Sequence, residues 1–198
     1  MLGDSIAWGQ GATRDRDRLS ARLVDGLASR GHDVEARVFA VPGARSAGLV
    51  SQVGQALSWG PDLAVVVIGA NDLTHLVPVE QAAQALRDAV RRLRAGGTEV
   101  VVAPAPDLSA VPHVPVFLRE TVRAAGNLLR TRQTSVVLAE GGRVADPDQR
   151  ASRAFATDPS LFSADLFHPS SAGYAVIADS LFPALLDAVQ QVERARAQ

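Results

Sequence analysis

The chain of 198 residues has no cysteine, so neither disulfides nor thiolate chemistry contributes to its stability or function. It has no excess of charge either, since 20 basic residues balance 21 acidic ones. Every basic residue is an arginine, and the arginines are spread among acids, which argues against nucleic acid as a partner. The longest apolar run, residues 63–68, is far too short to cross a bilayer, and nothing before Gly3 has the length of a secretory signal. The sequence as given predicts a cytoplasmic protein without a transmembrane segment.

The composition is that of one folded domain. With 47% hydrophobic and 21% charged residues, the chain is unlike disordered or collagen-like sequences. Its length suits a single domain over residues 1–198, large enough to bury most of the surface that its unfolded form exposes.

Short β-branched runs alternate with longer segments of helical period, a pattern typical of βαβ units and a mostly parallel sheet. The runs predict strands at residues 34–40, 63–68, 99–103 and 135–139. The second is apolar without alternation, as expected for a central strand covered by helices on both faces. Apolar residues at helical spacing predict helices within 19–27, 82–93 and 117–129. A last helix, from residue 170 to about 191, contains Pro183, which predicts a kink or a new helix start there.

Four short stretches of small and polar residues follow the predicted strands, at the carboxyl ends where ligands bind in open parallel sheets. They are GDSIAWG at residues 3–9, VPGARS at 41–46, IGAND at 68–72 and DLFHPSSAGY at 165–174.

The last stretch suggests a general base and the first suggests its nucleophile. Asp165 and His168 lie three residues apart, so a tight turn would bring the carboxylate onto the imidazole and fix its tautomer. The other ring nitrogen would then accept a proton from a serine, which is a weak nucleophile without such a base. Ser5 is the natural partner. The amides of Ser5 and Gly43, with the Asn71 side chain, would supply three donors for an oxyanion.

In this order and at these distances, the four stretches resemble the blocks of the SGNH hydrolases, the GDSL-type esterases and lipases. The resemblance extends from Gly3 to the helix after Tyr174, which is nearly the whole chain. It implies a flavodoxin-like three-layer α/β/α fold with strand order 2-1-3-4-5.

The resemblance also implies a role for each candidate residue. Ser5 would be the nucleophile, His168 the general base and then acid, and Asp165 the residue that orients it. The backbone amides of Ser5 and Gly43 and the side-chain amide of Asn71 would form the oxyanion hole. Neither metal nor cofactor is implied.

Each block also has a simpler interpretation when it is taken alone. A Gly-Asp-Ser sequence is a common turn, and Asp165 is a plausible helix cap. Two other motifs fail: Ala7 stands where the nucleophile elbow G-x-S-x-G needs a glycine, and no third glycine follows Gly9 and Gly11 at dinucleotide-binding spacing.

The remaining acids and histidines near these blocks are predicted to be structural. Asp4 and Asp72 are expected to accept hydrogen bonds from loop amides. His32, His75 and His113 are not expected to bind metal, because no pair has helical ligand spacing and no carboxylate cluster accompanies them. His75 is nevertheless a candidate for the wall of the substrate pocket.

The first strand is expected to be truncated. Only two residues precede Gly3, whereas a strand normally has about five residues, and the family has a buried strand directly before this turn. We therefore expect the true start of the protein to lie upstream of Met1. An upstream extension would also have room for a signal sequence, which would change the predicted location.

The predicted function is hydrolysis of carboxylic esters through an acyl-enzyme, with a small-molecule ester as the partner. Two loops after strands, residues 73–78 and 108–117, are expected to form the acyl or alcohol pocket through Leu76, Val77, Leu108, Val111, Val114 and Phe117. With no insertion large enough for a lid, short acyl groups are favoured. The alternatives are a carbohydrate or peptidoglycan O-acetylesterase, a thioesterase, a lysophospholipase, or an inactive ligand-binding module. The sequence does not define the oligomeric state.

Overall fold

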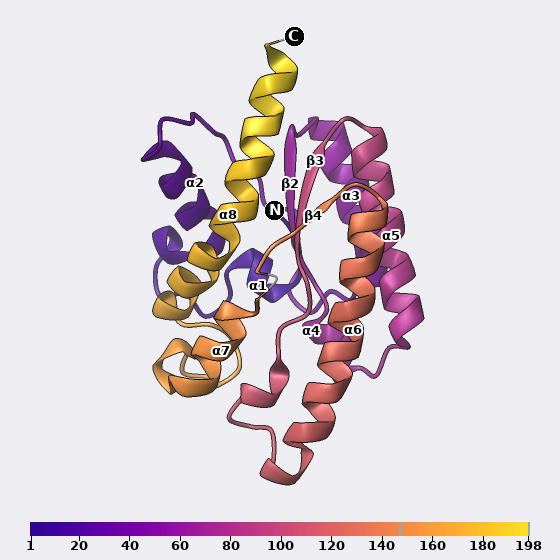
Figure 1. The fold of residues 1–198 in the computed structure, drawn as a ribbon. Coiled ribbons are helices and arrows are strands. Elements are labelled where there is room, and N and C mark those ends of the chain that lie inside the picture. Colours follow the sequence, from indigo (N-terminus) through magenta and orange to yellow (C-terminus); the bar gives the residue numbers. More distant parts are fainter. Residues whose placement is uncertain (147, 198) are drawn as a thin grey trace.

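In the computed structural model, a parallel sheet lies between two layers of helices (Figure 1). The structure describes residues 1–146 and 148–197. The strands are β1 (Leu2–Gly3), β2 (Leu63–Val67), β3 (Glu99–Ala103) and β4 (Arg143–Val144), in the order β1-β2-β3-β4. The helices are α1 (Ser5–Trp8), α2 (Leu19–Ala28), α3 (Leu49–Trp59), α4 (Ala70–Thr74), α5 (Val79–Ala95), α6 (Arg119–Ala139), α7 (Arg150–Thr157) and α8 (Ser171–Arg196). Short 3₁₀ helices are η1 (Asp15–Asp17), η2 (Ser46–Gly48), η3 (Leu108–Ala110), η4 (Val116–Leu118) and η5 (Pro159–Leu161).

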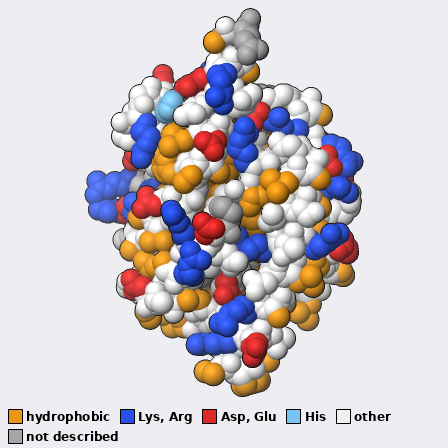
Figure 2. All heavy atoms as spheres, in the orientation of Figure 1, with side chains coloured by type: hydrophobic (Ala, Val, Ile, Leu, Met, Phe, Trp, Pro, Cys, Tyr) orange, Lys and Arg blue, Asp and Glu red, His pale blue; other side chains and the backbone are white. Residues whose placement is uncertain are grey.

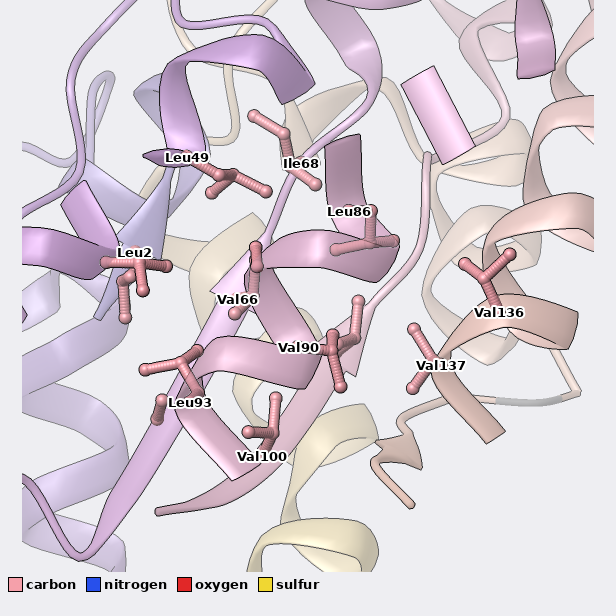
Figure 3. Packing of buried hydrophobic residues seen from close by; sticks show 14 of the residues in the cluster. Leu2, Leu49, Val66, Ile68, Leu86, Val90, Leu93, Val100, Val136 and Val137 are labelled. Atoms are coloured by element: carbon pink, nitrogen blue, oxygen red, sulfur yellow. The ribbon is translucent and has the colours of Figure 1, made fainter. Parts of the chain in front are cut away.

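Each face of the sheet has its own hydrophobic core. Val66, Val100 and Val102 pack with α3, α5 and α6 on one face (Figure 3). Val65 and Val101 point to the other face, where α2 and α8 cover them. Because alternate side chains of a strand point to opposite faces, a strand covered on both sides is apolar throughout, as predicted for residues 63–68. The predicted α/β class with a parallel sheet is confirmed.

Two of the predicted helices have the expected buried faces, and a third differs. The apolar residues at helical spacing in the two ranges are all buried: Leu19, Leu23 and Leu27 in α2, and Ala82, Leu86, Ala89, Val90 and Leu93 in α5. In α6, Leu129 is buried, but Leu128 is 56% exposed and Phe117, in η4, is 82% exposed. The helix starts two residues after Phe117 and has a narrower buried face than predicted.

The strand predicted at residues 135–139 is wrong, because this segment is the last part of α6. Val136 and Val137 are buried in the same hydrophobic core as the side chains of β2 and β3. Two consecutive buried β-branched residues are also what a central strand would show. Periodicity does not distinguish a short apolar run in a strand from one in a buried helix. The chain turns at Gly141, which has a φ of 74°, and only then forms β4.

Residues 34–40 are extended but are not a strand of the assigned sheet, so this strand prediction is also wrong. Phe39 N donates to Met1 O (2.8 Å) and Val41 N donates to Gly3 O (3.1 Å), which places the segment next to β1. β1 has only two residues and offers too few partners for a longer ladder. The five-stranded order 2-1-3-4-5 stays a prediction.

α8 continues through Pro183 as one helix, so the predicted new helix start is wrong there. By length and composition, α8 is the one helix of the described residues that is apolar enough to cross a membrane. Its side chains Tyr174, Leu181 and Leu185 are at most 2% exposed and pack in the core that α2 and β3 share. This packing favours a core helix.

Candidate active site

Ser5 is placed by the turn between β1 and α1. Gly3 has a φ of 131°, and a Cβ added to it would lie 1.8 Å from Val67 O, so the close approach of β1 to β2 requires glycine. Asp4 caps α1 by accepting from Ile6 N (2.9 Å). Ser5 is therefore the first residue of a helix, where backbone N–H groups have no helical partner.

Gln52 fixes the short strand before Ser5. Its side chain accepts from Gly3 N (2.7 Å) and donates to Gly3 O (2.9 Å), and it is buried. Gln133 binds the next two strand ends similarly, accepting from Ala105 N and donating to Ile68 O. Sequence reasoning missed both residues, because a lone glutamine within an amphipathic helix carries no distinguishing signal.

The structure brings Ser5, His168 and Asp165 into one hydrogen-bonded series. His168 Nε2 lies 3.0 Å from Ser5 Oγ, and His168 Nδ1 lies 2.6 Å from Asp165 Oδ2. An ionised carboxylate only accepts, so Nδ1 carries the proton of the neutral ring and Nε2 is free to accept one from the serine. Residues 163 positions apart in the chain thus meet as the sequence predicts.

The turn around Asp165 keeps its carboxylate ionised. Desolvation alone would raise the pKa of Asp165, but hydrogen bonds from the His168 ring, the backbone amides of His168 and Phe167, and the Ser163 hydroxyl outweigh it. The pKa of this carboxyl is therefore held well below its usual range. Ser163 was not predicted from the sequence.

Gly11 fixes the position of the histidine from the opposite side. A Cβ at Gly11 would lie 2.5 Å from Pro169 O and 3.0 Å from His168 Cβ, and the residue has a φ of 94°. The nearby loop is attached to α8, because Thr13 N donates to Ser171 Oγ and that hydroxyl donates to the buried Asp17. The glycine-rich loop after Ser5 thus supports the base.

The two other predicted donors lie on adjoining segments of the chain. Asn71, in α4, donates from Nδ2 to Ala44 O (3.1 Å), next to Gly43. Gly43 has a φ of 80°, and nothing lies within 4 Å of a Cβ added to it. The Asp72 carboxylate accepts from Ser46 N and from the Ser46 hydroxyl (2.8 Å). Asp72 thereby holds the Gly43 loop against α4, in the structural role predicted for it.

Asp4 has an unusual environment for an acid. It is 1% exposed, and Oδ2 has no hydrogen-bond partner among the described residues. Burial raises the pKa of Asp4 to about 7; the Ile6 amide opposes this shift and the nearby Asp72 adds to it. The predicted bond to a loop amide is present on the other oxygen only.

This raised pKa predicts a fall in stability with rising pH. The folded protein keeps the Asp4 proton up to about pH 7, whereas the unfolded chain releases it near pH 3.8, the ordinary pKa of an aspartate. Between these values the folded state binds more protons, so the free energy of unfolding decreases as pH increases. The fall should approach about 3 kcal/mol between pH 5 and pH 8, at 1.36 kcal/mol for each pKa unit. Urea unfolding across this range measures it.

The matched variant is Asp4→Asn, which keeps an acceptor for Ile6 N and cannot ionise. Between pH 5 and pH 8, the free energy of unfolding of this variant should lack the fall of about 3 kcal/mol that the parent shows. Equal slopes for the two proteins would refute a buried, titrating Asp4.

A small apolar cleft of about 80 Å³ adjoins Ser5 and His168. Its walls include Leu108 and Val111, as predicted, together with Phe155, Phe162, Phe167 and Ile177, which were missed. Phe155 and Phe162 meet edge to face, with ring centroids 5.0 Å apart. The missed aromatics come from α7 and from the segment after η5, where three phenylalanines within residues 155–167 are the available sequence signal.

Other residues predicted for this pocket do not line it. Leu76 is 88% exposed and Phe117 is 82% exposed. Val77 packs in a separate cluster, and Val114 packs in the cluster of Leu108 and Val111 without lining the cleft. His75 contacts Asn71 O through Nδ1 (2.9 Å) and is not among the residues that line the cleft. The loops after β2 and β3 thus contribute less of the wall than α7 and the segment before α8.

A serine, histidine and aspartate in series at the carboxyl edge of a parallel sheet form the arrangement that defines serine hydrolases as a class. The chain belongs to the GDSL-like Lipase/Acylhydrolase family, whose sequence model matches residues 1–176. The resemblance identified from the four sequence blocks is therefore confirmed.

One curated relative is the GDSL-like esterase Rv1075c of Mycobacterium tuberculosis, 39% identical over 195 residues. The alignment covers 96% of this chain and 62% of the relative, so the chain spans about three fifths of that protein's length.

Solved structures share the fold at low sequence identity. TesA has a TM-score of 0.79 at 21% identity, covering 94% of this chain and 97% of TesA. Axe2, an acetylxylan esterase from Geobacillus stearothermophilus, has a TM-score of 0.70 at 18% identity, covering 92% and 91%. The esterase EstA from Pseudoalteromonas sp. has a TM-score of 0.72 at 16% identity, covering 96% of each chain.

Proposed function

We propose that this protein is a serine esterase that hydrolyses carboxylic esters through an acyl-enzyme intermediate. The observation that carries the proposal is the contact of His168 Nε2 with Ser5 Oγ at 3.0 Å, with the opposite ring nitrogen bound to Asp165. This geometry provides a nucleophile, a base with a fixed tautomer and an ionised group to stabilise the imidazolium.

In the proposed reaction, Ser5 Oγ attacks the ester carbonyl while His168 Nε2 takes its proton. His168 then passes that proton to the departing alcohol, which leaves the acyl group on Ser5. Water, activated by the same nitrogen, attacks the acyl-enzyme and releases the acid. The carbonyl oxygen becomes negatively charged in both halves of the reaction, and the amides of Ser5 and Gly43 and the Asn71 side chain would donate to it.

Covalent labelling tests the proposal directly. A fluorophosphonate reacts with an activated serine, so the parent should incorporate one label per chain and the Ser5→Ala variant none. Ser163→Ala removes a different hydroxyl close to the histidine and should still be labelled, which makes it the matched control. An unlabelled parent that is folded would favour the alternative of a ligand-binding module.

Removal of one oxyanion donor should weaken catalysis without abolishing it. In Asn71→Ala we expect kcat to fall about 10²–10³-fold, the usual loss for one such donor. The backbone donors would remain. Steady-state kinetics on p-nitrophenyl acetate measure the effect, and an unchanged kcat would remove Asn71 from the proposed oxyanion hole.

The small cleft favours short acyl groups. A volume of about 80 Å³ is well below the roughly 300–1,000 Å³ of drug-sized ligand pockets, and aromatic rings form its walls. The value of kcat/KM should therefore be at least about tenfold higher for p-nitrophenyl acetate or butyrate than for the decanoate. A factor of ten corresponds to about 1.4 kcal/mol of binding energy that the longer chain fails to gain in the cleft. A preference for the decanoate would contradict this substrate class.

Phe155→Ala should enlarge the cleft and shift the preference toward longer acyl chains. Phe117→Ala is the matched control, because this phenylalanine is 82% exposed and does not line the cleft. An identical chain-length profile in both variants would show that the acyl group binds elsewhere.

A further inference from the structure

The tyrosine of the block that contains His168 has no part in the reaction described above. Tyr174 lies in the first turn of α8. The outer surface around α8 carries charged side chains of both signs (Figure 2), whereas Tyr174 is 0% exposed and belongs to the core between α8 and the sheet. Its hydroxyl donates to Gln10 O (2.7 Å), in the loop that follows α1. A buried tyrosine hydroxyl usually has a hydrogen-bond partner, and here the partner lies 164 positions away in the chain.

Gln10 is also hydrogen-bonded to the backbone of the proposed nucleophile. Gln10 N donates to Ser5 O (2.9 Å), and Gly9 N donates to the same carbonyl (3.0 Å). One residue therefore contacts Ser5 through its N–H group and α8 through its carbonyl. A displacement of Gln10 would change the position of Ser5 relative to α8.

The turn that carries His168 is held mainly by hydrogen bonds within its own segment. Ser163 N donates to His168 O (2.8 Å), and Ser170 N donates to Leu161 O (2.7 Å). These bonds fix the shape of the turn and its connection to α8. They do not fix its distance from Ser5, because both partners of each bond lie between η5 and the start of α8.

Two hydrogen bonds among the described residues join the start of α8 to the loop at residues 9–13. The bond from Thr13 N to Ser171 Oγ (3.1 Å) is exposed, so water competes for both groups. The bond from Tyr174 to Gln10 O has a fully buried donor. Because a hydrogen bond is stronger where water is excluded, the bond from Tyr174 restrains the loop more than the bond from Thr13 does.

The Tyr174 hydroxyl keeps its proton at neutral and mildly alkaline pH. Burial raises the pKa of Tyr174 well above its usual value, and the nearby Asp4 and Asp165 raise it further against the opposing effect of Arg18. The hydroxyl is therefore a constant donor to the Gln10 carbonyl, which as an acceptor needs one.

We propose that Tyr174 is a positioning residue, which sets the separation of Ser5 and His168 by binding the loop after the nucleophile to the helix after the base. The path consists of two hydrogen bonds, from Gln10 N to Ser5 O and from the Tyr174 hydroxyl to Gln10 O. Tyr174 does not line the cleft, so it acts through the other two residues. The inference rests on the proposed function, because it concerns the geometry of the residues that perform the reaction.

Tyr174→Phe tests this role, because it removes the hydroxyl and keeps the buried ring. We expect kcat for p-nitrophenyl acetate to fall at least about tenfold, since a displacement of about 1 Å between reacting groups is able to cost about 10²-fold. KM should stay within about twofold of the parent value, because the cleft is unchanged. Steady-state kinetics measure both constants.

Thr98→Val is the matched control. Thr98 is 1% exposed and lies directly before β3, at the end of the sheet away from Ser5, where its Oγ1 donates to Pro61 O (2.9 Å). Like Tyr174→Phe, this substitution removes a hydroxyl and leaves a buried carbonyl without its donor. Both variants should lower Tm by about 2–6 °C, but Thr98→Val should keep the parent kcat.

The ¹⁵N chemical shift of His168 Nε2 reports the contact with Ser5 without any turnover. In Tyr174→Phe the shift should move toward that of Ser5→Ala, in which the serine hydroxyl is absent, and in Thr98→Val it should not change. The chain has four histidines, so the signal is assigned by its loss in His168→Ala.

Two results would overturn the role of Tyr174: an Nε2 shift in Tyr174→Phe equal to that of the parent, or a loss of kcat no greater than that of Thr98→Val. Failure of the proposed function has a different signature. In that case the folded parent would not react with the fluorophosphonate, while the Nε2 shift would still show whether Tyr174 holds Ser5 against His168.

Discussion

Ser5→Ala and His168→Ala should each lower kcat for p-nitrophenyl acetate by about 10⁴–10⁶-fold, in line with the loss of a nucleophile or base in other serine hydrolases. Ser5 Oγ is the atom that would form the covalent bond, and His168 Nε2 is the group within 3.0 Å that accepts its proton. Neither function has a substitute among the described neighbours of this contact.

The double variant Ser5→Ala/His168→Ala tests whether the two residues act together. If the two residues act as one unit, losing both should cost no more than losing either, because each single loss already disables the covalent pathway. Two multiplicative losses would instead indicate that the residues act independently. Circular dichroism of all three variants checks that they are folded, since Ser5 is buried and His168 packs against Phe167.

The arrangement of the site was largely predictable from the sequence because its residues lie in short blocks at strand ends. Parallel strands bring their carboxyl ends to one edge, so the order of the blocks was enough to place the segments of Ser5, Gly43 and Asn71 at that edge. The contact between Ser5 and His168 required more, since nothing in the spacing fixes where the turn before α8 lies. The bond of Ser170 N to Leu161 O and that of Ser163 N to His168 O shape this turn in the structure.

The errors occurred where tertiary packing decides the local structure. Val136 and Val137 have strand-like composition, but α6 buries them by extending to Ala139. Residues 34–40 have a strand pattern, but β1 gives them few backbone partners. In both cases the neighbour that decides the outcome is distant in the sequence.

The substrate cleft was the least predictable part for a similar reason. The loops after β2 and β3 were expected to form it, and they contribute Leu108 and Val111. The aromatic wall comes from α7 and from the turn that carries His168, so the same segment supplies the base and much of the pocket. The centroids of the Phe167 and His168 rings lie 5.0 Å apart. A substitution of Phe167 would consequently affect both acyl binding and the orientation of the imidazole.

Asp165→Asn should lower kcat about 10⁴-fold, as the corresponding change does in a serine protease triad. The carboxylate accepts a hydrogen bond from His168 Nδ1 at 2.6 Å, which leaves Nε2 as the acceptor for Ser5. An asparagine amide is able to donate to Nδ1 instead. The ring would then carry its proton on Nε2 and could no longer accept one from the serine.

The pH profile distinguishes this tautomer effect from simple loss of structure. At high pH, hydroxide can take the serine proton in place of the histidine, so the activity of Asp165→Asn should keep rising above the pH at which the parent reaches its plateau. Ser163→Ala is the control, because it removes one hydrogen bond to Asp165 Oδ1 and leaves the carboxylate charge in place. Its loss of kcat should be no more than about 10²-fold, because one hydrogen bond to a charged group contributes about 1.5–3 kcal/mol. If Asp165→Asn lost no more than this control, the carboxylate would serve the fold of the turn and not the histidine.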